Sequence, residues 1–160
     1  GFIRNHYIGR TFIMPGVDER CRGVDLKLSL LPGVVKDKRV VVVDDSIIRG
    51  TTAKKRVACL REAGAKEVHM RVACPPTAFP CFFGIDFPTK AELIASSNDV
   101  ESIRRYLGAD SLGYLSLDGL LSPFGDKKND FCTACFNGKY PVDAGAMCGK
   151  HALERNMAVD

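Results

Sequence analysis

Two adjacent carboxylates followed by a loop of small and hydroxyl-bearing residues are the first feature of this sequence that could do chemistry. Asp44 and Asp45 come directly after four consecutive valines, and residues 46–52 are rich in Ser, Gly and Thr. Paired carboxylates can bind a polyol or a hard cation such as Mg²⁺. The N–H groups of a loop that leads into a helix suit a phosphate. The alternative is an ordinary strand before an N-capped helix, with both acids only capping or solvated.

The segments around these residues predict an α/β fold. Residues 40–43 lack polar alternation, which is typical of a central strand covered on both faces of a parallel sheet. Apolar residues recur at helical spacing over 51–65, and residues 67–73 return to a strand pattern. A right-handed β-α-β unit follows, with the two acids at the strand end where open α/β sheets bind ligands.

Shorter elements are expected on either side of this unit. We predict strands at 10–14, 24–30 and 112–115 and helices at 89–94, 98–107 and 117–121. Between the first two strands, a Pro-Gly and several charges predict a turn or mobile loop. After residue 123 no apolar periodicity returns, so an irregular tail is expected.

Residues 40–52 resemble the phosphoribosyl-pyrophosphate (PRPP) loop of the type I phosphoribosyltransferases, with its hydrophobic strand, Asp-Asp, small residues and Gly-Thr-Thr. The resemblance implies that Asp44 and Asp45 hold the ribose hydroxyls and its Mg²⁺. It also implies that a loop wraps the 5′-phosphate and that these residues form it: Ser46, Ile47, Ile48, Arg49, Gly50, Thr51 and Thr52.

A second stretch, residues 5–12, is similar to the flexible loop of one phosphoribosyltransferase family, the glutamine PRPP amidotransferases. In that family the loop closes over PRPP, which implies that Tyr7 and Arg10 close the site and help form a path for ammonia. Taken without the family, the same residues predict a surface hairpin. Residues 1–33 are therefore expected to form a flap region.

The cysteines form the second constellation. Seven of them, an odd number outside any secretory pattern, argue for reduced thiols or metal ligation in an intracellular setting. Cys132 and Cys135 have Cys-x-x-Cys spacing, which suits zinc, an iron–sulfur cluster or a redox pair. The redox pair is disfavoured because no strand-to-helix setting is expected there. A further ligand has to come from Cys81, Cys74 or Cys148.

Resemblance selects among these ligands. Residues 80–86 and 132–141 are similar to the cluster-bearing branch of the glutamine PRPP amidotransferases. This implies a [4Fe-4S] cluster held by Cys81, Cys132 and Cys135, with a fourth cysteine upstream of Gly1. The expected fold class is α/β, the second half of a type I phosphoribosyltransferase-like parallel sheet flanked by helices. Residues 1–122 would belong to that domain and residues 123–160 to an irregular, cluster-binding C-terminal tail.

The resemblance further implies a glycosyltransferase that moves glutamine-derived ammonia to C1 of PRPP, giving 5-phosphoribosylamine and pyrophosphate in the first committed step of de novo purine biosynthesis. Implied partners are a glutaminase domain of the same parent chain, purine nucleotide inhibitors and further copies in a homo-oligomer. The family's glutaminase nucleophile and pyrophosphate loop have no match, so the chain alone is expected to be inactive. A PRPP-sensing regulatory module and a base-using phosphoribosyltransferase are alternatives, but neither explains the cysteine trio.

Composition sets the remaining limits. With 160 residues, 46% of them hydrophobic and 26% charged, the chain has the size and composition of one globular domain. A net charge of +4 without a basic stripe argues against nucleic acid as a partner, and no apolar run is long enough to cross a bilayer. A cytoplasmic protein is expected. The start at Gly1, without Met or signal peptide, predicts an internal piece of a longer chain.

Overall fold

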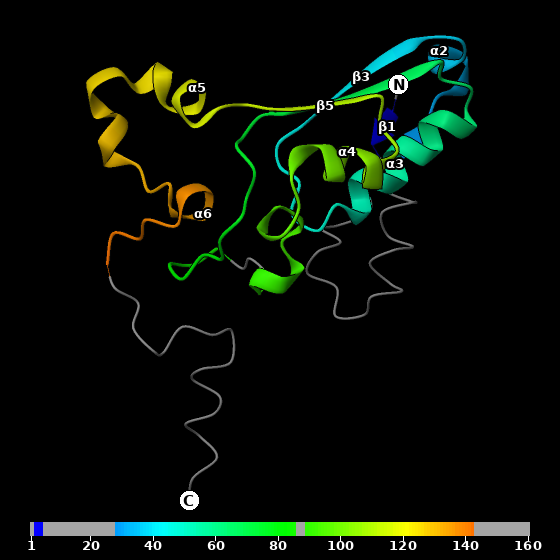
Figure 1. Cartoon of the computed structure of the whole chain (residues 1–160). Helices are drawn as coiled ribbons and strands as arrows, with labels where there is room; N and C mark the ends of the chain where they lie inside the picture. Colours follow the sequence, from blue (N-terminus) through cyan, green and yellow to red (C-terminus); the bar gives the residue numbers. More distant parts are fainter. Residues whose placement is uncertain (1, 5–27, 86–88, 143–160) are drawn as a thin grey trace, which may run out of the picture.

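Two small sheets organise the part of the chain that the computed structural model describes, residues 2–4, 28–85 and 89–142 (Figure 1). In the first sheet, β1 (Phe2–Arg4) pairs antiparallel with β2 (Leu28–Leu30). The second sheet is parallel, in the order β3 (Arg39–Asp44), β4 (Glu67–Val72), β5 (Ser111–Tyr114). This confirms the predicted α/β fold with a parallel sheet.

Two helices make the crossovers of the parallel sheet. Helix α3 (Thr51–Glu62) joins β3 to β4 and buries Ala53, Val57 and Leu60. Helix α4 (Val100–Leu107) leads into β5, and it begins where the Asp99 carboxylate accepts a hydrogen bond from the Ser102 N–H at 2.7 Å. Helix α3 was predicted from its apolar spacing and α4 from its start and stop residues, although α4 starts after Asp99 and not at residue 98.

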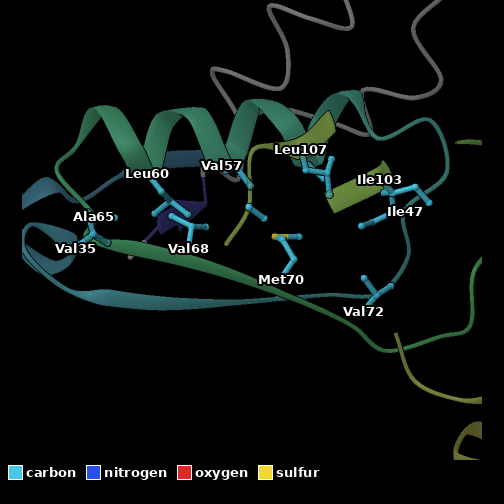
Figure 2. Close-up of a cluster of buried hydrophobic side chains, with 12 residues drawn as sticks. Val35, Ile47, Val57, Leu60, Ala65, Val68, Met70, Val72, Ile103 and Leu107 are labelled. Carbon is cyan, nitrogen blue, oxygen red and sulfur yellow. The ribbon is translucent and has the colours of Figure 1, made fainter. Parts of the chain in front are cut away.

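The hydrophobic core lies between these helices and the sheet (Figure 2). Val57 and Leu60 point from α3 towards Val68 and Met70 of β4, and all four are at most 1% exposed. Ile103 and Leu107 of α4 and Ile47 from the loop after β3 belong to the same cluster. The loop of interest is therefore attached directly to the core.

The prediction that the valine strand is central and covered on both faces is wrong for the described residues. Strand β3 is the end strand of its sheet, and Val41 and Val43 are 59% and 72% exposed. Val40 and Val42 pack against the core instead. The reason is that α3 and α4 both cover the same face of the sheet, as Figure 2 shows for α3 and the core.

The remaining segments are short. Helix α2 (Pro32–Val35) precedes β3, and two 3₁₀ turns, η2 (Lys90–Glu92) and η3 (Ile94–Ser96), replace the single helix predicted at 89–94. Helix α5 (Leu117–Leu121) was predicted, whereas η4 (Ser122–Asp130) and α6 (Ala134–Asn137) lie where an irregular tail was expected. Among the described helices, none has the length and apolar character needed to cross a membrane.

Candidate functional site

The acid pair lies at the carboxyl end of β3, as predicted. Asp44 is the last residue of the strand and half-buried, while Asp45 follows it and is exposed. One carboxylate oxygen of Asp44 accepts a hydrogen bond from the Asp45 N–H at 3.2 Å, and Asp45 accepts one from the Ser46 hydroxyl at 3.1 Å. The two carboxylates therefore start from different environments.

Arg56, in the second turn of α3, binds the other oxygen of Asp44. The distance from Arg56 Nη1 to Asp44 Oδ2 is 2.5 Å, and the two side chains are 25% and 21% exposed. Sequence reasoning did not single out Arg56, so it missed this contact. Its position one helical turn after Thr52 is the signal that could have found it, because residues four apart share a helix face.

The loop after the acids is fixed from below by the core. Ile47 is 3% exposed, and the carbonyl of Ile48 accepts a hydrogen bond from the Ile94 N–H at 2.9 Å. Gly50, at φ 77°, forms the turn into α3, and a Cβ there would lie 2.9 Å from Ile94 Cδ1 and 3.1 Å from Tyr106 Cε1. Only glycine fits this position without strain or displacement of its neighbours.

Side-chain contacts brace the outside of the same loop. Arg49 forms an ion pair with Glu92 of η2 at 2.7 Å, and the Lys54 ammonium lies 4.3 Å from the centre of the Tyr106 ring. Thr51 and Thr52 open α3, so their N–H groups and hydroxyls are available at the positive end of the helix dipole. The predicted loop thus joins β3 to α3 with the Ile47 side chain in the core and not at a ligand site. Contacts from η2, η3 and α4 support the loop, and sequence reasoning did not identify them.

The cysteine-bearing segments meet through backbone and aromatic contacts. The carbonyl of Cys135 accepts hydrogen bonds from the N–H groups of Ala78 and Phe79, both at 3.1 Å. The Tyr140 hydroxyl donates to the Pro80 carbonyl at 2.8 Å, and the Tyr140 ring lies against that of Phe82 with a centroid distance of 4.9 Å. The tail is thereby attached to the segment that carries Cys81.

The surroundings of Cys135 raise the pKa of its thiol. Burial raises the pKa of this thiol, and negative charge on Cys81 and Cys132 raises it further. Even so, no three His, Cys, Asp or Glu side chains within residues 2–4, 28–85 and 89–142 lie close enough together to hold a metal ion. The charges of Cys81 and Cys132 act on Cys135, but within the described residues the three cysteines do not form a finished metal site.

For Mg²⁺ the fit is different, because this ion is commonly held by one or two carboxylates together with substrate phosphates and water. Asp44 and Asp45 offer hard oxygen donors next to the phosphate-type loop. These two residues therefore suit Mg²⁺ that arrives with a phosphorylated ligand.

Cys74 lies near both the acid pair and the cysteine-bearing tail. It comes two residues after the end of β4 and is half-buried, and its pKa is raised to about 11, mainly by burial and further by the charges of Asp45 and Cys135. In the sequence, Cys74 is one of three candidate further metal ligands, and the resemblance selects Cys81 instead. The place of Cys74 after a parallel strand next to β3 is the signal that could have placed it at the ligand edge. Tyr7, Arg10 and Cys148 lie outside the described residues.

Fold and site together define a class. An open parallel sheet, with two acids ending a strand and a glycine-capped loop leading into the crossover helix, is the arrangement of a type I phosphoribosyltransferase unit.

Comparison with known proteins gives the particular family. The chain is 56% identical over 142 residues to a chloroplastic amidophosphoribosyltransferase of Vigna aconitifolia, and 56% identical over 147 residues to the amidophosphoribosyltransferase of Bacillus subtilis. It is 47% identical over 165 residues to that of Mycobacterium bovis. These matches cover 89%, 89% and 99% of this chain and 29%, 31% and 31% of the relatives. No family model matches the sequence.

A solved structure agrees with these relatives. It is a glutamine PRPP amidotransferase from B. subtilis complexed with ADP and GMP, with a TM-score of 0.73 and 56% identity over 88% of this chain and 32% of that chain. We identify the chain as a segment homologous to the amidophosphoribosyltransferases. It spans about a third or less of the length of the relatives it matches.

Proposed function

We propose that this chain provides the ribose- and phosphate-binding part of an amidophosphoribosyltransferase, which transfers glutamine-derived ammonia to C1 of PRPP to give 5-phosphoribosylamine and pyrophosphate in purine biosynthesis. The observation that carries the proposal is the acid pair at the end of β3 beside a loop that is fixed by the core and capped by Gly50. The high identity of the relatives named amidophosphoribosyltransferase favours this function over a PRPP sensor or a base-using transferase.

Different residues of the site would bind the ribose and the 5′-phosphate of PRPP. Asp44 and Asp45 accept hydrogen bonds from the ribose hydroxyls, because ionised carboxylates are strong acceptors. The N–H groups of residues 46–52 and the hydroxyls of Ser46, Thr51 and Thr52 bind the 5′-phosphate at the start of α3. Tyr7 and Arg10 remain predicted as the flap that closes over PRPP.

Mg²⁺, when bound, would supply positive charge for the pyrophosphate leaving group. Asp44 and Asp45 are the residues that would hold it. Ammonia is already a competent nucleophile, so no catalytic base is required of this chain.

Binding of ribose 5-phosphate tests the proposal directly, and isothermal titration calorimetry of the purified chain measures it. We expect Asp45→Asn to weaken binding about tenfold, equivalent to the loss of one charge-assisted hydrogen bond. Asp118→Asn removes an exposed acid from α5 and is the matched control, expected to bind as the unchanged chain does. No binding by the unchanged chain, or equal effects of both variants, would contradict the proposed site.

A [4Fe-4S] cluster on Cys81, Cys132 and Cys135, with its fourth cysteine from outside this chain, is part of the same proposal. It is supported by the contacts that bring Cys81 towards the other two cysteines. Iron and sulfide analysis of anaerobically purified full-length protein tests it. We expect four irons per chain and their loss in Cys132→Ser, while Cys59→Ser, in an exposed residue of α3, keeps them. Zinc without iron would contradict the cluster.

The expected partners belong to the proposal as well. A glutaminase domain of the same parent chain would release the ammonia, and purine nucleotides would inhibit, in line with the ADP and GMP named for the B. subtilis structure. Homo-oligomer formation and a cytoplasmic location complete it. Because the chain lacks a glutaminase nucleophile and a pyrophosphate loop, we expect the isolated chain to release no ammonia from glutamine and to make no phosphoribosylamine.

A further inference from the structure

The acid pair is asymmetric. Both carboxylate oxygens of Asp44 already accept hydrogen bonds from within the chain, one from the Asp45 N–H at 3.2 Å and one from Arg56 Nη1 at 2.5 Å. Asp45 is exposed and accepts a hydrogen bond from the neighbouring Ser46 hydroxyl. Asp44 is therefore fixed before any ligand binds, and a helix residue outside the recognised loop motif fixes it.

The environment of Arg56 points beyond a surface ion pair. Its side chain is 25% exposed, and its Nε is buried without a hydrogen-bond partner in the described part of the chain. A buried donor without a partner destabilises a fold, so an arginine kept in such a place calls for an explanation. The side-chain interaction that Arg56 makes at this position is its ion pair with Asp44.

The positive charge of Arg56 affects which ligands the acid pair can bind. Two neighbouring carboxylates repel an anionic sugar phosphate, whereas a guanidinium bound to one of them offsets part of that repulsion. On the basis of the proposed function, we propose that Arg56 is a positioning residue of the ribose phosphate site, which orients Asp44 and offsets its charge so that the loop accepts an anionic ligand.

This role predicts effects of opposite sign on two ligands. A bare divalent cation is attracted by the carboxylates and repelled by Arg56, so loss of Arg56 strengthens its binding. An anionic sugar phosphate has the reverse preference, so loss of Arg56 weakens its binding. A purely structural role of Arg56 in holding the loop would weaken both.

The test uses the purified chain with two probes. Electron paramagnetic resonance of free Mn²⁺ measures cation binding, and calorimetry in metal-free buffer measures ribose 5-phosphate binding. For Arg56→Gln we expect Mn²⁺ to bind about threefold more tightly or better, and ribose 5-phosphate about threefold more weakly or worse. Arg105→Gln makes the same charge change at an exposed position of α4 and should shift neither by more than about twofold.

A second variant covers the case in which Arg56→Gln does not fold by circular dichroism. Arg56→Lys keeps the charge but loses the planar fork, so its Mn²⁺ affinity should stay within about twofold of the unchanged chain. Weakening of both probes, effects of Arg56→Gln equal to those of Arg105→Gln, or tighter Mn²⁺ binding by Arg56→Lys would overturn the inference. If the unchanged chain binds Mn²⁺ but not ribose 5-phosphate, the proposed function fails, and the Mn²⁺ comparison still decides whether Arg56 offsets the charge of Asp44.

Discussion

At the residue scale, Gly50 sets the shape of the phosphate-type loop. Its φ of 77° and the closeness of Ile94 and Tyr106 leave no room for a side chain. We expect Gly50→Ala to lower the free energy of unfolding by about 1–3 kcal/mol, because it combines a left-handed alanine with a steric clash. The same variant should bind ribose 5-phosphate more weakly, since the loop has to shift. Urea unfolding and calorimetry measure the two effects.

Gly33 provides the matched control for this prediction. It lies in the short helix α2, and a Cβ there would meet no atom within 4 Å. Gly33→Ala should therefore be neutral or slightly stabilising, by up to about 1 kcal/mol, because it restricts the unfolded chain. If both alanines had the same effect, the argument from the geometry of Gly50 would be wrong.

At the scale of elements, Asp110 joins three of them. Its carboxylate accepts a hydrogen bond from the Val68 N–H of β4 at 2.6 Å and one from Arg61 of α3 at 2.6 Å, just before β5 begins. The Val68 N–H and, after it, Arg61 lower the pKa of Asp110 below its ordinary value of 3.8. The contact therefore stabilises the fold above about pH 4, and this contribution is lost as the pH falls through the lowered pKa.

Asp110→Asn should remove this contribution. We expect a loss of about 1 kcal/mol at pH 7, kept small because the Asp110 side chain is 38% exposed and water screens the ion pair. The difference from the unchanged chain should shrink towards zero as the pH falls below about 4. Thermal unfolding of both proteins from about pH 2 to about pH 7 measures this difference in stability. A difference that stayed constant with pH would contradict the assigned cause.

How much of these elements the sequence predicted depends on how local the signal was. The parallel β3-α3-β4 unit, the acids at the end of β3 and the end of α4 at Leu107 follow from patterns within a few residues, and all were predicted. The Arg56 contact with Asp44 and the brace of Ile94 on Gly50 were not. These two contacts depend on how a helix is rotated about its axis and on which distant segments pack together. The spacing of residues along the sequence does not determine either.

At the scale of the whole molecule, one face of the parallel sheet carries the core, and no described helix covers Val41 and Val43 on the other face. Leu60 is fully buried among the core residues, whereas Val43, which looks equally apolar in the sequence, is 72% exposed. We expect Leu60→Ala to lower the free energy of unfolding by about 2–5 kcal/mol and Val43→Thr to change it by less than about 0.5 kcal/mol. Urea unfolding compares them, and a large effect of Val43→Thr in a monomeric sample would show that this face is packed.

The position of β3 at the end of the parallel sheet, as far as the described residues go, has a consequence for anyone who handles the chain in solution. No described strand pairs with the outer side of β3, and the side chains of Val41 and Val43 add an apolar surface. Such a border is a template onto which a strand from another molecule can add. Concentrated samples should therefore self-associate through residues 39–44. The substitution Val43→Lys should prevent this association, because it places a charge on the exposed side of the strand.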